Sequence, residues 1–377
     1  MANKAVSPIA LITDYDDGLS IAALLVNAGY QVICHDRRKS KSKKAKPPTG
    51  VTTVTSIKDA LKSAATVVTV VKSQQSDEDV YMMGGGVLAH AKAASLFVDM
   101  SPISPRMARE MHALAAVHDH RYVDAPYLGN VRELQANQAL LFAGGEPGAL
   151  KQAMPLLGAI SQNILETGLP GTGAATRLAW QIALAGSLLG LVEAISFAAL
   201  NSVDKSTIVE LLKGQNSLIA GVAGAYGPAI EAEDFNGGLS VAAYLDDLNL
   251  ALESADEGSL PLPGLETVQQ LYDLLQLISD DRRGIQSLAL AYYDDRNSER
   301  FGLNWQLAQK AMDVYERGGE DDEDEYDMYY DEDQSHHDHA HHQDRSTREG
   351  YGFDGFGEMG GGPEGNRPST GNFFSDN

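Results

Sequence analysis

The chain has 377 residues, of which 43% are hydrophobic, and a formal net charge of -23. This length and apolar content are enough for two domains with well-packed cores. The acidic balance excludes general nucleic-acid binding. One cysteine, Cys34, stands in a predicted buried strand, so an intramolecular disulfide framework is excluded. No cationic, apolar leader precedes the first predicted strand, and we expect a soluble, cytoplasmic protein.

Residues 8–36 predict a strand, a turn, a helix and a second strand, as in the first βαβ unit of a dinucleotide-binding domain. The pattern G-x-G-x-x-G would place glycines at positions 13, 15 and 18. Gly18 is present, whereas Thr13 and Tyr15 fill the other two positions. The turn also carries three carboxylates, at Asp14, Asp16 and Asp17.

These substitutions act against a bound pyrophosphate. The missing glycines would allow a tight turn and a close approach of backbone N–H groups. A Tyr15 side chain would take up that space, and carboxylates beside a pyrophosphate repel it. Two interpretations stay open: a Rossmann-type scaffold that binds no dinucleotide, and a site with weakened or rearranged binding.

Farther along, the chain predicts an α/β part, a helical part and a tail. Apolar runs separated by helical patterns predict a mainly parallel sheet, at residues 9–13, 31–36, 51–54, 66–71, 96–99, 121–124, 139–143 and 163–167. Residues 169–317 predict helices, interrupted at Gly214, at Gly237-Gly238 and at 261–264. We therefore expect a Rossmann-type domain over 1–168, a helical domain over 169–317 and a disordered tail over 318–377.

One apolar stretch, Leu178 to Leu200, is long enough to suggest a membrane span. It contains Gln181 and Glu193 and lies between globular segments. We interpret it as a buried interdomain helix and expect no membrane association.

The tail holds 17 acidic residues and three Arg, which prevents it from burying enough apolar surface to fold. A histidine tract within it could hold a transition metal weakly and adventitiously, through His336, His337, His339, His341 and His342. The Tyr and Phe residues spaced along 350–377 could bind a protein partner.

Five further motifs follow the first turn in a fixed order. They are Asp99-Met100-Ser101-Pro102, Asp124-Ala125-Pro126-Tyr127-Leu128-Gly129-Asn130, Leu141-Phe142-Ala143-Gly144-Gly145, Gly168-Leu169-Pro170-Gly171-Thr172-Gly173 with Arg177-Leu178, and Tyr244-Leu245-Asp246-Asp247. Over roughly residues 8–290 this order resembles the β-hydroxyacid dehydrogenase family, which includes 3-hydroxyisobutyrate and 6-phosphogluconate dehydrogenases and imine-reductase relatives.

The resemblance implies a Rossmann domain joined by a long helix to a helical domain, and a homodimer formed through the helical domain. It implies hydride transfer between NAD or NADP and a hydroxyl or imine carbon. It places the nucleotide against Thr13, Tyr15, Gly18, Asp36, Arg37, Ser101 and Gly129. The family's catalytic lysine, a general acid and base, is assisted by an Asn one helical turn later.

This sequence departs from the family at those catalytic positions. Arg177 replaces the lysine, Gln181 the Asn and Asp246 a second lysine. Arginine stays protonated in proteins and cannot cycle protons near neutral pH. In one interpretation Arg177 and Asp246 form an ion pair, and the former active site is structural. In the other the chemistry is rebuilt around Tyr127 and Asp246 as proton donors.

The second predicted strand runs into a basic segment with seven cations between Asp36 and Lys46. An acid at this point suits the ribose of NAD, whereas an adjacent arginine such as Arg37 suits the 2′-phosphate of NADP. The lysines of 39–46 are interpreted as a solvated loop. A separate hypothesis places the acidic residues 320–333 across residues 37–46 through a salt-sensitive attraction.

Taken together, these residues predict a catalytically degenerate, dimeric binding or scaffold protein that acts through its acidic tail. The alternative is an NAD(P)-dependent oxidoreductase with a rebuilt active site.

Overall fold

The computed structural model describes residues 8–38, 46–129, 131–215, 217–278, 283–293 and 300–307. The described residues lie in one compact unit. The predictions for the histidine tract, for the tail and for its contact with the lysines of 39–45 concern residues outside the described ranges.

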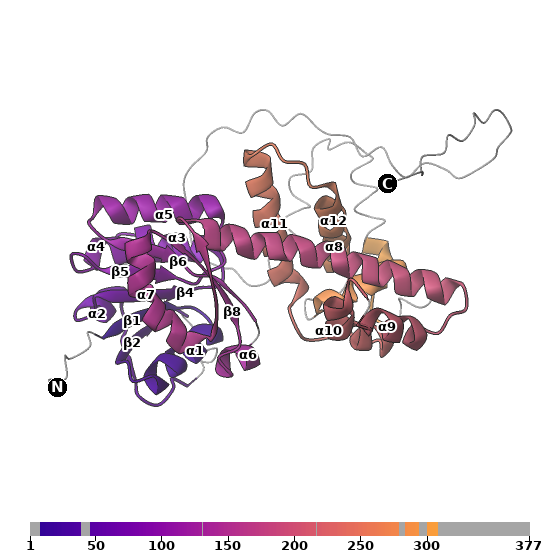
Figure 1. Cartoon of the computed structure of the whole chain (residues 1–377), viewed down its shortest axis with the longest axis horizontal. Coiled ribbons are helices and arrows are strands. Elements are labelled where there is room, and N and C mark those ends of the chain that lie inside the picture. Colours follow the sequence, from indigo (N-terminus) through magenta and orange to yellow (C-terminus); the bar gives the residue numbers. More distant parts are fainter. Residues whose placement is uncertain are drawn as a thin grey trace, which may run out of the picture. The chain divides into compact units, whose positions relative to one another are not determined.

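The first part of the chain forms a mixed sheet in which most neighbouring strands are parallel (Figure 1). The strands are β1 (Ile9–Thr13), β2 (Val32–Asp36), β3 (Val51–Thr53), β4 (Thr66–Val70), β5 (Leu96–Asp99), β6 (Arg121–Asp124), β7 (Tyr127–Leu128), β8 (Leu140–Gly145) and β9 (Asn163–Gly168). Their order is β3-β2-β1-β4-β5-β6-β8-β7, with β9 paired to β8. Strand β8 runs antiparallel to β6 and β7. All eight predicted apolar runs form strands, and the two-residue β7 is an addition.

Helices cover both faces of this sheet, as expected for a parallel sheet. They are α1 (Asp16–Asn27), α2 (Ile57–Leu61), α3 (Gln74–Met82), α4 (Val87–His90), α5 (Pro105–Val117), α6 (Val131–Gln135) and α7 (Pro147–Ile160). Alternate residues of a strand point to opposite faces. Ile9 and Leu11 therefore pack in one core with α1 and α7, while Ala10 and Ile12 pack in another with α2 and α5.

The second part is helical. The predicted breaks at Gly214 and at Gly237-Gly238 fall between two helices, whereas the predicted break at 261–264 overlaps the first turn of a helix. Its elements are α8 (Thr172–Leu200), α9 (Lys205–Lys213), α10 (Ala220–Glu231), α11 (Val241–Glu257), α12 (Pro263–Ile278) and the 3₁₀ segment η2 (Ile285–Tyr292). Their buried side chains form a third core, which includes Leu188, Tyr244 and Tyr272. Gly171, at φ 87°, precedes α8 at its N-cap position, and there a side chain would meet the carbonyl oxygen of Pro105.

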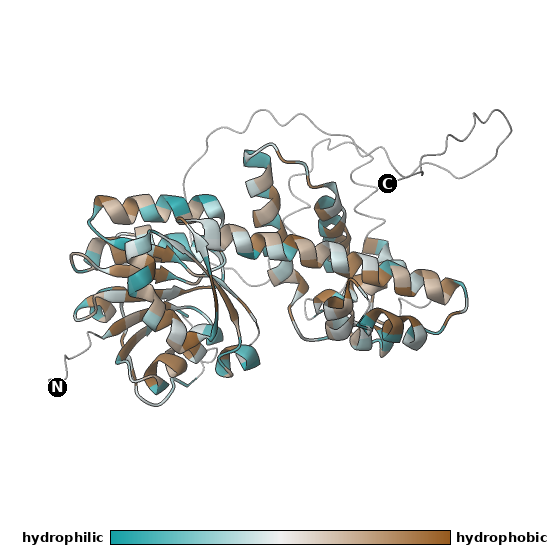
Figure 2. Ribbon diagram, viewed as in Figure 1, coloured by the Kyte–Doolittle hydropathy of each residue, from teal (hydrophilic) through white to brown (hydrophobic). Residues whose placement is uncertain are grey.

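Helix α8 joins the two parts, because it packs against β8 and β9 near its start and against α9, α10, α11 and α12 farther on. Figure 2 shows hydrophobic residues along much of its length. Among the described helices, α8 alone is long and apolar enough to cross a membrane by length and composition. Only 39% of its most apolar window is buried, so α8 buries one face rather than its whole surface. A core helix of a soluble protein can meet the same criteria.

Candidate functional site

Strands β1, β4 and β5 are parallel and in register, so their carboxyl ends lie at one edge of the sheet. The turn after β1, the loop after β4 and the segment after β5 therefore meet there. In doubly wound folds ligands bind outside the carboxyl ends of the strands. Most of the nucleotide-site residues expected from the sequence lie at this edge.

The turn from β1 to α1 is built around Thr13 rather than a glycine. The Thr13 hydroxyl donates to the carbonyl oxygen of Tyr15 at 3.1 Å and accepts from the Tyr15 N–H at 3.3 Å. A Cβ on Gly18 would lie 2.1 Å from Thr13 Oγ1. Gly18 is the one glycine of the fingerprint that is present. It must be a glycine because Thr13, which replaces the first glycine, fills the space that a side chain at position 18 would need.

Each of the three carboxylates in this turn has a partner elsewhere in the chain. Asp14 accepts from the Lys72 N–H at 3.0 Å and from the Ser76 hydroxyl at 2.5 Å. Asp16 accepts from Arg38, and Asp17 accepts from Tyr127. The repulsion expected between this turn and a phosphate is therefore partly compensated within the chain.

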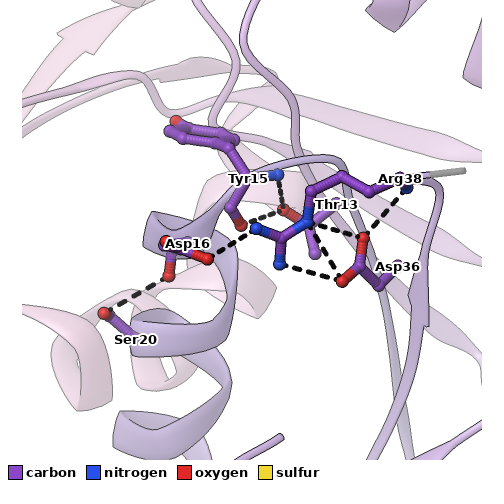
Figure 3. A network of polar contacts seen from close by, with 6 residues as sticks. All are labelled: Thr13, Tyr15, Asp16, Ser20, Asp36 and Arg38. Atoms are coloured by element: carbon purple, nitrogen blue, oxygen red, sulfur yellow. Dashed lines mark hydrogen bonds and ion pairs between the residues drawn. The ribbon is translucent and has the colours of Figure 1, made fainter. Parts of the chain in front are cut away.

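Arg38 lies between the turn and the end of β2 (Figure 3). Its Nη1 donates to Asp16 Oδ1 at 2.6 Å, and its Nη2 donates to Asp36 Oδ2 at 2.9 Å. The two Asp36 oxygens also accept from Arg38 Nε, at 3.1 and 3.2 Å. Asp36, together with Asp16, raises the pKa of the Arg38 guanidinium further, so this bridging cation is permanent.

Arg37, the residue expected from the sequence to suit a ribose phosphate, is held at α3 instead. Its Nη1 donates to the carbonyl oxygen and the hydroxyl of Ser76, at 2.9 and 3.0 Å, and Nη2 lies 3.7 Å from Asp79. Sequence reasoning gave Arg38 no individual role. Its position directly after Asp36 and Arg37 was the available signal.

A chain of hydroxyls connects the same turn to β7. Tyr15 Oη and Tyr127 Oη lie 2.9 Å apart, and Tyr127 donates to Asp17 Oδ2 at 2.6 Å. Burial is the main cause that raises the pKa of each of these three groups. Tyr15 therefore points toward Tyr127, and both phenols stay protonated at neutral pH.

The positions expected to be catalytic meet around one carboxylate on α11. Arg177 Nη1 and Nη2 donate to the two oxygens of Asp247 at 2.6 and 2.8 Å. Gln181 Nε2 donates to Asp247 Oδ2 at 2.7 Å. The Asp247 side chain is 3% exposed and that of Arg177 13%. Arg177 Nε also donates to the Tyr127 carbonyl oxygen at 3.3 Å, which brings α8, α11 and β7 together.

The predicted ion pair between Arg177 and Asp246 is wrong, because Arg177 pairs with Asp247 instead. Neighbouring residues of a helix point about 100° apart, so only one of the two aspartates can face α8. Asp247 is buried there, whereas Asp246 is exposed. Desolvation by the surrounding chain and the charge of Asp247 nevertheless raise the pKa of Asp246, and Lys72 opposes this shift.

Ser101 is fully buried, and its hydroxyl is engaged within the protein. It donates to Asp77 Oδ1 at 3.1 Å and accepts from the Val71 N–H at 3.2 Å. Asp99, also buried, accepts from the Ser101 N–H and from the Tyr122 hydroxyl. Burial raises the pKa of both Asp77 and Asp99, and the charge of Asp99 raises that of Asp77 further. Ser101 is thus part of a buried network beneath the edge.

Gly129 follows β7 with φ 142°, in a conformation that side chains rarely adopt. A Cβ there would lie 3.1 Å from the side chain of Ala139. The glycine is therefore required by the local backbone, whatever binds nearby.

Asp124, at the end of β6, is a residue whose role sequence reasoning missed. Its carboxylate accepts from the Gly171 N–H at 2.8 Å and from the Ala174 N–H at 2.9 Å. It therefore caps the start of α8, the helix that carries Arg177 and Gln181. Burial raises the pKa of Asp124 to about 7 against the opposing effect of these backbone N–H groups.

The edge fits a dinucleotide in part. Helix α1 has no side-chain hydrogen bond at its N-cap, Asp36 and Arg38 stand where a ribose would lie, and Thr13 supports the turn. Helix N-termini favour phosphate. Among the described residues, no group of three or more metal-ligating side chains is placed to hold an ion.

Comparison with known proteins places this arrangement among dehydrogenases. Residues 17–168 match the model of the NAD binding domain of 6-phosphogluconate dehydrogenase. Residues 171–291 match that of the NAD-binding domain of NADP-dependent 3-hydroxyisobutyrate dehydrogenase. Both NAD and NADP are therefore possible cofactors.

Individual relatives agree with these models. The chain is 27% identical over 276 residues to an uncharacterized oxidoreductase of Bacillus subtilis, a match covering 72% of this chain and 93% of that protein. It is 28% identical over 268 residues to an NAD-dependent L-serine dehydrogenase of Pseudomonas aeruginosa, covering 68% and 88%. The fold matches that of a 3-hydroxyisobutyrate dehydrogenase of Mycobacterium tuberculosis with a TM-score of 0.69 and 24% identity, over 75% of this chain and 98% of that one.

Proposed function

This chain belongs to the β-hydroxyacid dehydrogenase family, and on that premise we propose that it binds NADP or NAD without the family's lysine-dependent proton transfer. It is then a catalytically degenerate member that works as a binding or scaffold protein in the cytoplasm. Its acidic tail, residues 318–377, is the segment that we propose binds a protein partner.

The observation that carries this proposal is the cluster of Arg177, Gln181 and Asp247. A general acid must release its proton near neutral pH, and a guanidinium does not. Here both terminal nitrogens of Arg177 are also committed to a carboxylate that is 3% exposed. The two residues at the family's catalytic positions thus hold α8 against α11 rather than offering a proton to a substrate.

A homodimer formed through the helical domain remains part of the proposal. Helices α8 and α9 leave large apolar side chains in solvent, among them Phe197 at 70%, Leu200 at 83% and Leu211 at 67% exposure. We propose that these side chains belong to the dimer surface, since exposed apolar patches are typical of protein interaction surfaces. Sedimentation of the full chain measures the oligomeric state.

The chain formed by Tyr15, Tyr127 and Asp17 favours a second candidate, an oxidoreductase with a rebuilt site. A bound nicotinamide would supply the hydride to a carbonyl or imine carbon. In this chain the phenol of Tyr15 or Tyr127 would donate the proton that the reduced carbonyl oxygen or imine nitrogen takes up. Asp17, whose pKa is raised by burial, would then relay a replacement proton from solvent to Tyr127. Asp246, with its raised pKa, is a second proton donor for the same role.

Turnover by the full chain with NADPH and NADH, against a panel of small carbonyl compounds and cyclic imines, separates the two candidates. We expect binding of nucleotide and no turnover by the wild type. The double variant Arg177→Lys/Gln181→Asn restores the family's pair and should gain measurable turnover if the fold is otherwise intact. Wild-type turnover that is lost in Tyr127→Phe would contradict degeneracy and establish the rebuilt site.

A further inference from the structure

Asp77 and Asp99 are two carboxyl groups buried close together beneath the carboxyl edge of the sheet. Asp77 lies on α3 and is 0% exposed, and Asp99 ends β5 and is 1% exposed. We propose that these two groups share a single proton, and that this proton fastens α3 to the sheet and releases the helix when it is lost. The proposal concerns a proton-operated clamp and goes beyond the proposed function.

The first argument is the hydrogen bonding of this acid pair. Asp99 accepts from the Ser101 N–H at 3.0 Å and from the Tyr122 hydroxyl at 2.7 Å. Asp77 Oδ1 accepts from the Ser101 hydroxyl at 3.1 Å, whereas Asp77 Oδ2 is buried without a donor among the described residues. The two carboxyl groups lie within hydrogen-bonding reach of each other, although ionised carboxylates only accept hydrogen bonds. A proton between the two groups provides the donor that this contact requires.

The second argument is the charge around the acid pair. The titratable and charged groups that face it are Arg37 after β2, Tyr81 on α3, and Tyr122 and Asp124 on β6. The two phenols stay protonated at neutral pH, since burial raises the pKa of each. Arg37 is the only cation in this set, and its guanidinium donates to Ser76 and lies 3.7 Å from Asp79. Two ionised carboxylates would therefore repel each other in a buried place that disfavours both charges.

The third argument is what the first turn of α3 holds together. Ser76, next to Asp77, donates to Asp14 in the β1–α1 turn at 2.5 Å, and its hydroxyl accepts from Arg37 at 3.0 Å. Helix α3 thus ties the segments that follow β1 and β2, and Asp77 adds a fully buried contact to the segment that follows β5. Whatever holds Asp77 in place therefore also holds three segments of the carboxyl edge.

Loss of the shared proton leaves two buried negative charges that repel each other. Asp99 is fixed, because β5 pairs with β4 on one side and with β6 on the other. Asp77 is carried by a helix of nine residues, so we expect α3 to move outward until water solvates its carboxylate. This opening releases one proton. Its equilibrium constant therefore rises about ten-fold per pH unit for as long as the closed form keeps the proton.

Amide hydrogen exchange of the full chain, followed by mass spectrometry and divided by the intrinsic rate at each pH, measures this opening. We expect the opening constant of α3 to rise about ten-fold per pH unit between about pH 6 and pH 8, and that of α7, in the other core of the sheet, to stay nearly constant. In Asp77→Asn the amide donates to Asp99 and has no proton to lose, so the rise should vanish. Asp124→Asn changes a buried acid outside the pair and should keep the rise.

Infrared spectroscopy tests the shared proton directly. At neutral pH the carbonyl band of a protonated carboxyl group should appear in the wild type and be lost in Asp77→Asn. Asp124 is present in both proteins, so its contribution cancels in the difference spectrum. Circular dichroism checks that the variants are folded, and the comparison of α3 with α7 in the wild type needs no variant.

An opening constant of α3 that does not depend on pH in the wild type, or that depends on pH equally in Asp77→Asn, would overturn the clamp. Absence of the carbonyl band from the difference spectrum would overturn the shared proton and the clamp with it. Neither measurement uses a nucleotide, so the proposed function is tested separately.

Discussion

The ion pair between Arg177 and Asp247 should be among the largest single contributions of a polar contact to the stability of this protein. In the variant Arg177→Met the buried carboxylate of Asp247 keeps its bond to Gln181 but loses its counter-charge. Removing one partner of a buried pair typically costs about 3–5 kcal/mol, because the remaining charge is desolvated without compensation. We expect a loss in this range, toward its lower end because the Arg177 side chain is 13% exposed.

The assay is urea unfolding of the full chain followed by circular dichroism and by tryptophan fluorescence, with coincident transitions required before a free energy is derived. The double variant Arg177→Met/Asp247→Leu removes both charges. It should cost less than the sum of the single variants, with a coupling of about 2 kcal/mol or more between the two positions.

The chain offers a matched control in Arg106, which also pairs with a carboxylate on α11. Its partner Glu257 lies at 3.1 Å, but the two side chains are 62% and 44% exposed. Arg106→Met should therefore cost no more than about 1 kcal/mol. If Arg177→Met were no more destabilising than Arg106→Met, the argument that burial makes the Arg177 pair decisive would be refuted.

Two other predictions test the start and the end of the site. Gly18→Ala should destabilise the protein by about 1–3 kcal/mol, since its Cβ would lie 2.1 Å from Thr13 Oγ1, and Thr13→Gly in the same chain should recover part of that loss in urea unfolding. The pKa of Asp124 is raised to about 7 in the folded protein, so the folded protein keeps a proton that the unfolded chain releases near pH 4. The contribution of Asp124 to the free energy of unfolding therefore falls as the pH rises from about 4 to 7, and it is constant above that range. Asp124→Asn should remove this slope, which is up to about 1.4 kcal/mol per pH unit. If the difference in the free energy of unfolding between wild type and variant did not change from pH 5 to pH 8, the raised pKa would be contradicted.

Much of the architecture could be predicted from the sequence because the signals are local. Apolar runs with turn residues between them predicted each strand from β1 to β6, together with β8 and β9. Glycine and proline clusters predicted the ends of the helices in the second part. The two-residue β7 was not predicted, since so short a strand has no periodicity of its own and exists only because β8 pairs with it.

The candidate site was predicted in part, as a set of positions. Motif order indicated Arg177, Gln181, Tyr127 and the aspartates of α11. It could not distinguish Asp246 from Asp247, because the choice depends on which side of α11 faces α8. Nor could it distinguish Arg37 from Arg38, since both follow the same strand and differ only in which neighbour they reach.

The sequence by itself therefore determined the kinds of element, their order and the loss of the family's lysine. Periodicity, turn residues and residue chemistry are properties of short segments and need no knowledge of distant partners. Tertiary structure alone decided which carboxylate holds Arg177, which arginine lies between the β1–α1 turn and the end of β2, and how Asp124 caps α8. These contacts join residues separated by many positions in the chain, and their geometry exists only once β1, β6, α8 and α11 have packed.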